Sequence, residues 1–285
     1  MALTITNISK TSGKTSRLKN INLNFEAGQI YGLLGRNGAG KSTLLNIIAD
    51  RLPASRGQVT IDGTPVHERD KQLQRLYLMS EDNLYPGDRR VRQLFDLTAQ
   101  FYGTFDRENA DRLANVFGLD VNARFRNLST GYRTIFKDIV ALCVPVDYVL
   151  LDEPVLGLDA NHRSRFYDEL MASYVDRPRT FIISTHLVEE IEHLLNGVVV
   201  IADGKIKVAE QVETLMATAV QLSGPADVMA PILETVTVLA QHQFAKQTTA
   251  IVMVETMPTL PTTVTQQALN LQALFVALTE DEHEI

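Results

Sequence analysis

The chain has 285 residues, of which 45% are hydrophobic and 21% are charged, so its composition is that of a folded globular protein and not of a disordered or fibrous one. The net charge of −7 argues against a general affinity for nucleic acid or anionic lipid. The single cysteine, Cys143, excludes an internal disulfide and a cysteine-based zinc cluster, and it fits a reducing cytoplasm. No apolar run approaches the roughly 18 to 20 residues that cross a bilayer, and the N-terminus lacks the pattern of a signal peptide. We therefore expect a cytoplasmic chain.

Acidic residues gather toward the C-terminal end. Residues 211–285 hold one Lys or Arg, Lys246, and eight acidic residues, whereas acidic and basic residues are equal in number over residues 1–210. Such a step in composition predicts a boundary between two modules. We expect a catalytic module at residues 1–210 and an accessory module at residues 211–285, whose acidic end at residues 280–284 forms a solvated terminus.

Strand and helix patterns alternate along the first module. Strands are expected at residues 3–8, 21–25, 29–34, 59–61 and 76–79, with a helix starting at about Lys41. Between Val91 and Ala141 the apolar residues recur at helical spacing, which predicts a helical subdomain at about residues 86–146. Strands return at residues 148–151, 180–184 and 198–201, separated by helices at residues 163–174 and 187–194. This alternation predicts a mainly parallel sheet covered by helices on both faces.

A glycine-rich segment between a predicted strand and a predicted helix carries the first chemical signal. Residues 35–42 read Gly-Arg-Asn-Gly-Ala-Gly-Lys-Ser, which fits the phosphate-binding pattern G-x-x-x-x-G-K-[ST]. Glycines let backbone N–H groups converge on an anion, and the following helix adds its positive end. Lys41 should reach the β- and γ-phosphates of a nucleotide, and the Ser42 hydroxyl should bind Mg²⁺. The expected nucleotide-binding residues are Asn37, Gly38, Ala39, Gly40, Lys41, Ser42 and Thr43. The alternative, a chance glycine-rich turn, fits this context poorly.

Two adjacent carboxylates follow the predicted strand at residues 148–151. Asp152 at the strand end can complete the Mg²⁺ shell, and Glu153 can polarise a water for attack on the γ-phosphate. A solvated acidic turn is the alternative, which the phosphate-binding segment makes less favourable. The pair therefore predicts hydrolysis of a nucleoside triphosphate, with Asp152 and Ser42 as the Mg²⁺ ligands.

Three further motifs make the pattern specific. They are Leu-Ser-Thr-Gly-Tyr-Arg at residues 128–133, Gly-Leu-Asp at residues 157–159 and Ser-Thr-His at residues 184–186. Along the chain the five motifs are the glycine-rich segment, residues 128–133, the acidic pair, residues 157–159 and residues 184–186. With these motifs in this order, the first 210 residues resemble the nucleotide-binding subunit of an ATP-binding cassette (ABC) transporter. The tail loosely resembles the C-terminal extension of bacterial exporters of the bacitracin type. The resemblance implies an α/β fold of the P-loop NTPase (RecA-like) class, with a helical subdomain and a small C-terminal α/β extension.

The resemblance also implies roles and partners. His186 would act beside Glu153 in catalysis, while Ser129 and Gly131 would contact the ATP of a second subunit and Asp159 would lie at the dimer interface. The chain would form a homodimer or a heterodimer, use ATP and Mg²⁺, and power a separate membrane permease, as an exporter subunit at the inner face of the plasma membrane that binds no nucleic acid.

These residues can also have purely structural roles, and the chain can have a different function. His186 can be a structural histidine at a strand end, and Ser129 and Asp159 can be helix caps. The second candidate function is a soluble ABC ATPase that acts on nucleic acid or ribosomes. A third, a small-molecule kinase, leaves the motifs at residues 128–133 and 184–186 unexplained.

The sequence departs from the family pattern at several positions. Ser12 stands where an aromatic residue usually stacks on adenine. Ser80, Glu81 and Asp82 stand where a glutamine usually senses the γ-phosphate. In the motif at residues 128–133, Thr130 replaces a glycine and Tyr132 replaces a glutamine. These departures leave base recognition and turnover rate open.

Overall fold

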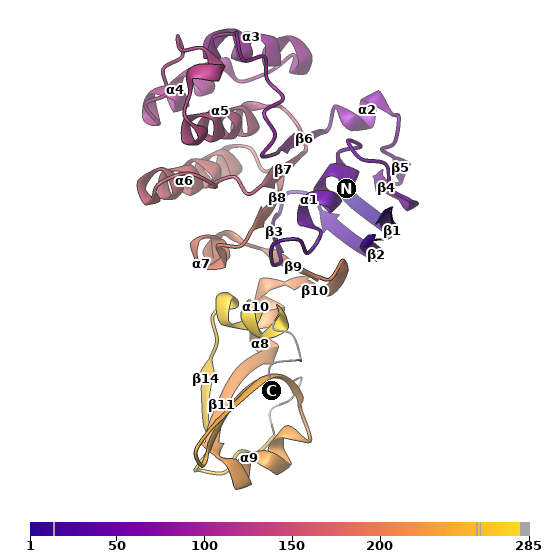
Figure 1. Ribbon diagram of the computed structural model, residues 1–285, viewed down its shortest axis with the longest axis vertical. Coiled ribbons are helices and arrows are strands. Elements are labelled where there is room, and N and C mark those ends of the chain that lie inside the picture. The colour runs from indigo at the N-terminus through magenta and orange to yellow at the C-terminus, as the bar shows by residue number, and fades with distance from the viewer. Residues whose placement is uncertain (14, 255, 257, 280–285) are drawn as a thin grey trace.

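Three β-sheets lie along the long axis of the molecule, with the helical subdomain at one end and the C-terminal region at the other (Figure 1). The computed structural model describes residues 1–13, 15–254, 256 and 258–279. The acidic end at residues 280–284 lies outside the described residues. Below, the N-terminal region means residues 1–211 and the C-terminal region means residues 212–279.

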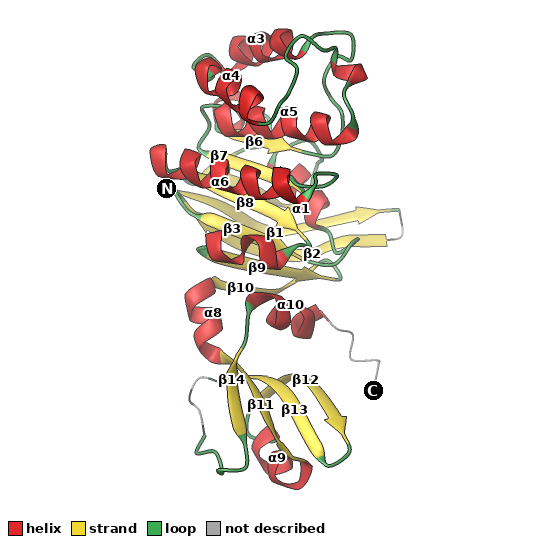
Figure 2. Ribbon diagram, turned by 90° about the vertical axis from the view of Figure 1, so that its left-hand side faces the viewer, coloured by secondary structure: helices red, strands yellow, loops and turns green. Residues whose placement is uncertain are grey.

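The central sheet has six strands in the order β10-β9-β3-β8-β7-β6 (Figure 2). In that order the strands are Lys205–Gln211, Gly197–Ala202, Ile30–Leu34, Thr180–Thr185, Tyr148–Asp152 and Leu76–Met79. All neighbours are parallel except β10, which is antiparallel to β9. Every residue of β3, β6, β7 and β8 is buried, as in a parallel sheet covered on both faces. The carboxyl ends of β3, β7 and β8 therefore meet at one edge, where Leu34 pairs with Thr185 and Asp152 with Ser184.

The earliest strands do not join the central sheet. β1 (Ala2–Ser12), β2 (Thr15–Glu26), β4 (Arg56–Ile61) and β5 (Thr64–Pro65) form a separate antiparallel sheet in the order β2-β1-β4-β5. The expectation of one mainly parallel sheet is therefore correct for the central sheet and wrong for these strands. The reason is the short turn that pairs Ser12 with Thr15, since parallel neighbours need a long crossover. Helix α1 (Lys41–Ile48) packs between the two sheets in a shared hydrophobic core.

The helical segment expected between residues 91 and 141 is confirmed as three helices, α3 (Val91–Tyr102), α4 (Arg107–Val116) and α5 (Thr130–Cys143), with the short helix η1 (Phe125–Asn127). Its core is aromatic: Phe136 packs on Phe95, Phe125 and Tyr85, with ring centroids 5.4, 5.3 and 4.8 Å apart. The helix expected at residues 163–174 is α6 (Ala160–Asp176), whereas the one expected at 187–194 breaks into α7 (Val188–Ile191) and η2 (Glu192–Leu194). The short α2 (Asp70–Leu73) precedes β6.

The C-terminal region builds its own small sheet. β12, β13, β11 and β14 lie in this order and are antiparallel. In chain order the elements are α8 (Val212–Thr218), β11 (Ala219–Pro225), α9 (Ala226–Leu233), β12 (Thr237–Phe244), β13 (Gln247–Met253), β14 (Thr265–Ala268) and α10 (Leu271–Thr279). The proposed domain limits at residues 210, 86 and 146 stay predictions, although the chain leaves the central sheet at Gln211.

Helix α10 returns from the C-terminal region to the N-terminal region. Its buried residues Leu271, Leu274 and Phe275 belong to the same hydrophobic core as Val188 and Ile191 of α7. Figure 2 shows α10 lying between β10 and the C-terminal sheet. Among the described helices, none is both long enough and apolar enough to cross a membrane.

Candidate functional site

The glycine-rich segment connects β3 to α1. Gly38 and Gly40 have φ angles of +84° and +115°, in the region that favours glycine. A Cβ on Gly40 would lie 2.8 Å from Leu18 Cδ2, so the position also lacks room for a side chain. The segment leads directly into the N-terminus of α1, where unpaired backbone N–H groups and the helix dipole favour an anion.

Lys41 is the first residue of α1, and only 6% of its side chain is exposed. Its Nζ donates a hydrogen bond to Gly35 O at 2.7 Å and lies 3.5 Å from Glu153 Oε1. Ser42 is exposed and Thr43 is partly buried on the same turn. The glycine-rich segment and the acidic pair predicted from the sequence therefore meet through Lys41.

The acidic pair lies where β7 ends. Asp152 is buried, and its Oδ1 accepts a hydrogen bond from Ser184 Oγ at 2.9 Å. Glu153 has a left-handed backbone, with φ of +50°, and its N–H donates to Ser184 O at 3.0 Å. This turn gives the two neighbouring carboxylates different surroundings, because only Asp152 is held by the hydroxyl of β8.

Glu153 lies between Lys41 and His186. Its Oε2 is 2.9 Å from His186 Nδ1, while its Oε1 faces Lys41. The three side chains follow the carboxyl ends of β7, β3 and β8, which are neighbours in the central sheet. A carboxylate that contacts an imidazole and lies beside the lysine of a glycine-rich segment can orient and deprotonate a water.

The residues expected to bind Mg²⁺ provide oxygen donors. No group of three or more His, Cys, Asp or Glu side chains that could hold a metal occurs in the part of the chain that the structure describes. Mg²⁺ typically binds one or two protein oxygens and completes its shell with phosphates and water. The Asp152 carboxylate and the Ser42 hydroxyl fit that mode of binding.

Ser129 and Asp159 both cap helices. Ser129 Oγ accepts a hydrogen bond from Tyr132 N at 3.2 Å at the start of α5. Asp159 Oδ1 accepts one from His162 N at 2.9 Å at the start of α6, and its Oδ2 lies 2.8 Å from His162 Nδ1. The bonds from His162 hold the pKa of Asp159 below its ordinary value. The capping alternatives are therefore correct, and they leave the proposed roles possible because a cap can face a second subunit.

Gly131 packs against the segment that contains Asp159. A Cβ at Gly131 would lie 3.0 Å from Gly157 O, so these two motifs touch within one chain. Among the described residues, no hydrogen bond or ion pair connects Ser129, Gly131 or Asp159 to Lys41, Glu153 or His186. Ser12 is also separate from this group, exposed beside the turn between β1 and β2.

A cavity of about 150 Å³ lies beside the acidic pair. Its walls come from the segment after β6, from α5 and from the end of β7. Lys137 lines it together with Asp152 and Glu153, and sequence reasoning missed this lysine. The available signal was a charged Lys-Asp pair within the apolar stretch at residues 135–143.

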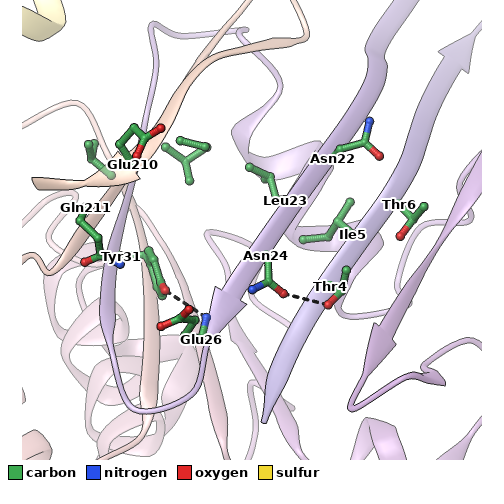
Figure 3. Close-up of a pocket in the computed structure, with 13 residues that line it drawn as sticks. Thr4, Ile5, Thr6, Asn22, Leu23, Asn24, Glu26, Tyr31, Glu210 and Gln211 are labelled. Carbon is green, nitrogen blue, oxygen red and sulfur yellow. Dashed lines mark hydrogen bonds between the residues drawn. The ribbon is translucent and has the colours of Figure 1, made fainter. Parts of the chain in front are cut away.

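A wider cleft of about 550 Å³ separates β1 and β2 from β9 and β10 (Figure 3). It is lined largely by polar side chains, two of which, Thr4 and Asn24, hydrogen-bond to each other at 2.9 Å. Tyr31 Oη accepts a hydrogen bond from Glu26 N at 3.0 Å on one of its walls. None of the predicted site residues lines this cleft, so it is separate from the candidate site.

Known proteins resemble this chain in sequence. A family model described as ABC transporter matches residues 18–156. The chain is 30% identical over 199 residues to the ABC transporter ATP-binding protein YtrB of Bacillus subtilis (strain 168), a match that covers 70% of this chain and 68% of YtrB. It is 31% identical over 215 residues to Nod factor export ATP-binding protein I of Cupriavidus metallidurans, covering 73% of this chain and 70% of that protein.

Solved structures show the same fold. The ATP-binding subunit of an ABC transporter matches with a TM-score of 0.69 at 20% identity, over 76% of this chain and 92% of that one. A dimeric ATP-binding cassette bound to ADP and phosphate matches with a TM-score of 0.65 at 22% identity, over 74% of this chain and 98% of that one. From its relatives and its fold, the chain belongs to the ATP-binding proteins of the ABC transporter family, which are ATPases.

Proposed function

We propose that Glu153 is the general base of Mg²⁺-dependent ATP hydrolysis and that His186 orients it and the attacking water. The supporting observation is the position of the Glu153 carboxylate, 3.5 Å from Lys41 Nζ and 2.9 Å from His186 Nδ1. Lys41 binds the β- and γ-phosphates, and Ser42 and Asp152 hold Mg²⁺, which neutralises phosphate charge when bound. The backbone of residues 37–43 surrounds the phosphates.

A second nucleotide-binding subunit completes each site in this proposal. Ser129 and Asp159 are exposed in the single chain, and within the described residues neither forms a hydrogen bond or ion pair with Lys41, Glu153 or His186. The start of α5 offers a hydroxyl and a positive helix end to the phosphates of the partner's ATP. The dimer is built from two copies of this chain or from this chain and a related one.

A membrane permease on a separate chain is the proposed partner, which would place the protein at the inner face of the plasma membrane. In the helical subdomain, the segments around Arg89 and Phe125 lie side by side. Phe125 N donates a hydrogen bond to Arg89 O at 2.9 Å, and Arg126 N donates one to Gly87 O at 3.0 Å. The pairing gathers exposed arginines that form no ion pair within the described residues, namely Arg89, Arg90, Arg92, Arg124 and Arg126. This surface suits an acidic segment of a permease.

Export is the proposed direction of transport. Four relatives named as Nod factor export proteins are 28% to 32% identical to this chain, and one named as a ribose import protein is 27% identical. The alternative, an ATPase that acts on nucleic acid or ribosomes, is disfavoured by the net charge of −7.

The test is Glu153→Gln, with Glu189→Gln on the exposed side of α7 as the matched control. Glu153→Gln should cut kcat by about 10² to 10⁴, the range for a lost acid–base catalyst, while ATP binding persists. Steady-state ATPase assays and a nucleotide titration measure the two quantities. Turnover within a few-fold of wild type would remove Glu153 from this role, and an equal loss in Glu189→Gln would show that the effect is not local.

A further inference from the structure

Lys137 is a buried lysine in the middle of α5. Only 5% of it is exposed, and its Nζ donates hydrogen bonds to Ser80 O at 2.7 Å and to Glu81 O at 2.9 Å. These carbonyls belong to the segment that leaves the central sheet after β6, at the position where the sequence departs from the family pattern. A side chain of the helical subdomain therefore holds this segment.

The ammonium group of Lys137 is bound by neutral partners. It forms no ion pair with a carboxylate of the described residues, and burial lowers its pKa. Burying a cation is unfavourable unless its donors are satisfied, and a lysine has three. The two carbonyls satisfy two of these donors, and the third is available to the cavity that Lys137 lines together with Asp152 and Glu153.

Helix α5 also contacts the segment after β7. Thr134 Oγ1, one turn before Lys137, donates to Leu156 O at 3.3 Å. Arg51 binds the same stretch: its Nη1 donates to Ser80 Oγ at 3.3 Å and its Nη2 donates to Leu78 O at 2.9 Å. The segment after β6 is thus held by Arg51, which follows α1, and by Lys137 of α5, the helix that Ser129 caps.

We propose that Lys137 is a positioning residue for ATP hydrolysis: it fixes the backbone of Ser80 and Glu81 beside the cavity that Asp152 and Glu153 line, and it ties that segment to the helix that Ser129 caps. The inference rests on the proposed roles of Glu153 and Ser129. The usual glutamine is absent here, and in its place the backbone of Ser80 and Glu81 is fixed by a cation from α5. A movement of α5 would then shift the segment at Ser80 and Glu81, and a movement of that segment would shift α5.

The test compares Lys137→Met, which keeps the apolar stem and loses the donors, with Lys137→Arg, which keeps a charged donor. Lys71→Met, at an exposed lysine of α2, is the matched control. We expect Lys137→Met to lower kcat by about 10- to 100-fold, as small displacements of catalytic groups do, with the KM for ATP nearly unchanged. Lys137→Arg should recover at least about a third of kcat, because a guanidinium can donate to both carbonyls. Amide hydrogen exchange at residues 81–84 should become faster in Lys137→Met only.

Two results would overturn the proposal: a Lys137→Met enzyme that keeps kcat within about twofold of wild type, or one that loses ATP binding and thermal stability together with kcat and is not rescued by arginine. If Lys137→Met does not fold, Lys137→Arg decides alone, since a folded variant with less than about a tenth of wild-type kcat contradicts the proposed contact. Glu153→Gln separates the two proposals. If Glu153→Gln is inactive while Lys137→Met is fully active, only the inference about Lys137 fails.

Discussion

The N-terminal and C-terminal regions differ in what they bury. The buried charged residues of the described chain all lie in the N-terminal region; they are Lys41, Lys137, Asp138, Asp152 and Arg179. The core of the C-terminal sheet consists of apolar side chains, namely Val220, Leu222, Met229, Ala250, Val252 and Val264. Because burying a charge is unfavourable, a protein keeps such groups mainly where binding, chemistry or positioning needs them. From this difference we expect the chemistry to lie in the N-terminal region and not in the C-terminal sheet.

Helix α10 is the exception to this division. By sequence it belongs to the C-terminal region, but Leu274 and Phe275 pack into the core of the N-terminal region. At its start, Glu192 Oε2 accepts a hydrogen bond from Leu271 N at 3.1 Å. The C-terminal sheet therefore has a core of its own, while α10 belongs to the core of the N-terminal region.

The same substitution in both regions gives the largest expected difference. Lys41→Met should lower kcat by about 10² or more, since it removes a cation that faces transferring phosphoryl groups in the proposed site. Lys246→Met, at an exposed lysine between β12 and β13, should leave kcat unchanged. ATPase assays of both variants at saturating ATP measure this. Equal losses of kcat in the two variants would contradict the assignment of catalysis to the N-terminal region.

A second pair tests whether α10 belongs to the core of the N-terminal region. Leu274 is fully buried and Val276 is 39% exposed, so Leu274→Asp buries an unpaired carboxylate and Val276→Asp does not. Leu274→Asp should lower the free energy of unfolding by about 2 to 5 kcal/mol. Urea unfolding, followed by circular dichroism, gives the value. If the two variants unfold alike, α10 is not part of this core.

Asp138 provides a test with a defined pH dependence. Neither carboxylate oxygen of Asp138 has a hydrogen-bond partner, and burial raises its pKa well above the ordinary value of 3.8. Below that value both the folded and the unfolded chain carry the proton. As the pH rises, only the unfolded chain ionises, so the folded state loses stability until the raised pKa is reached.

Asp138→Leu should therefore stabilise the protein at neutral pH by about 1 to 3 kcal/mol, the usual cost of an unsatisfied buried polar group. The gain should shrink toward pH 4, and the exposed Asp168→Leu should show no such trend. Urea unfolding at a series of pH values measures it. A gain that is constant with pH would show that Asp138 has the same pKa in the folded and the unfolded chain, which would contradict the raised pKa.

The smallest expected effects come from one helix cap in each region. Asp159 caps α6, and Asn270 Oδ1 accepts a hydrogen bond from Ala273 N at 2.8 Å at the start of α10. Alanine at either position should cost about 0.5 to 2 kcal/mol of stability. Only Asp159→Ala should also weaken ATP-dependent dimerisation, measured by sedimentation at matched stability. An equal effect of Asn270→Ala on dimerisation would contradict the proposed interface.

Local sequence patterns predicted most of the central sheet and the glycine-rich segment. Strand β6 was predicted at its observed bounds, because four apolar residues between polar flanks can hardly form another element. The contacts of Glu153 with Lys41 and His186 follow from motifs placed at the ends of neighbouring parallel strands. The roles of these residues stay predictions.

Other features depend on contacts between distant parts of the chain. Lys137 binds Ser80, 57 residues away, and Glu192 binds Leu271, 79 residues away. No local periodicity encodes such pairs, so neither the fixed segment after β6 nor the return of α10 could be read from the sequence. The separate antiparallel sheet was missed because alternation of strands and helices does not specify which strands pair.

The return of α10 also governs the order in which the protein can be completed during synthesis. Proteins emerge from the ribosome N-terminus first, and early domains generally fold before later ones appear. Here α7, which follows His186, packs in one core with α10 (Leu271–Thr279), which is synthesised after the whole C-terminal sheet. The core beside α7 therefore stays open until α10 has been synthesised, and a chain whose synthesis stops before Leu271 leaves that core uncovered.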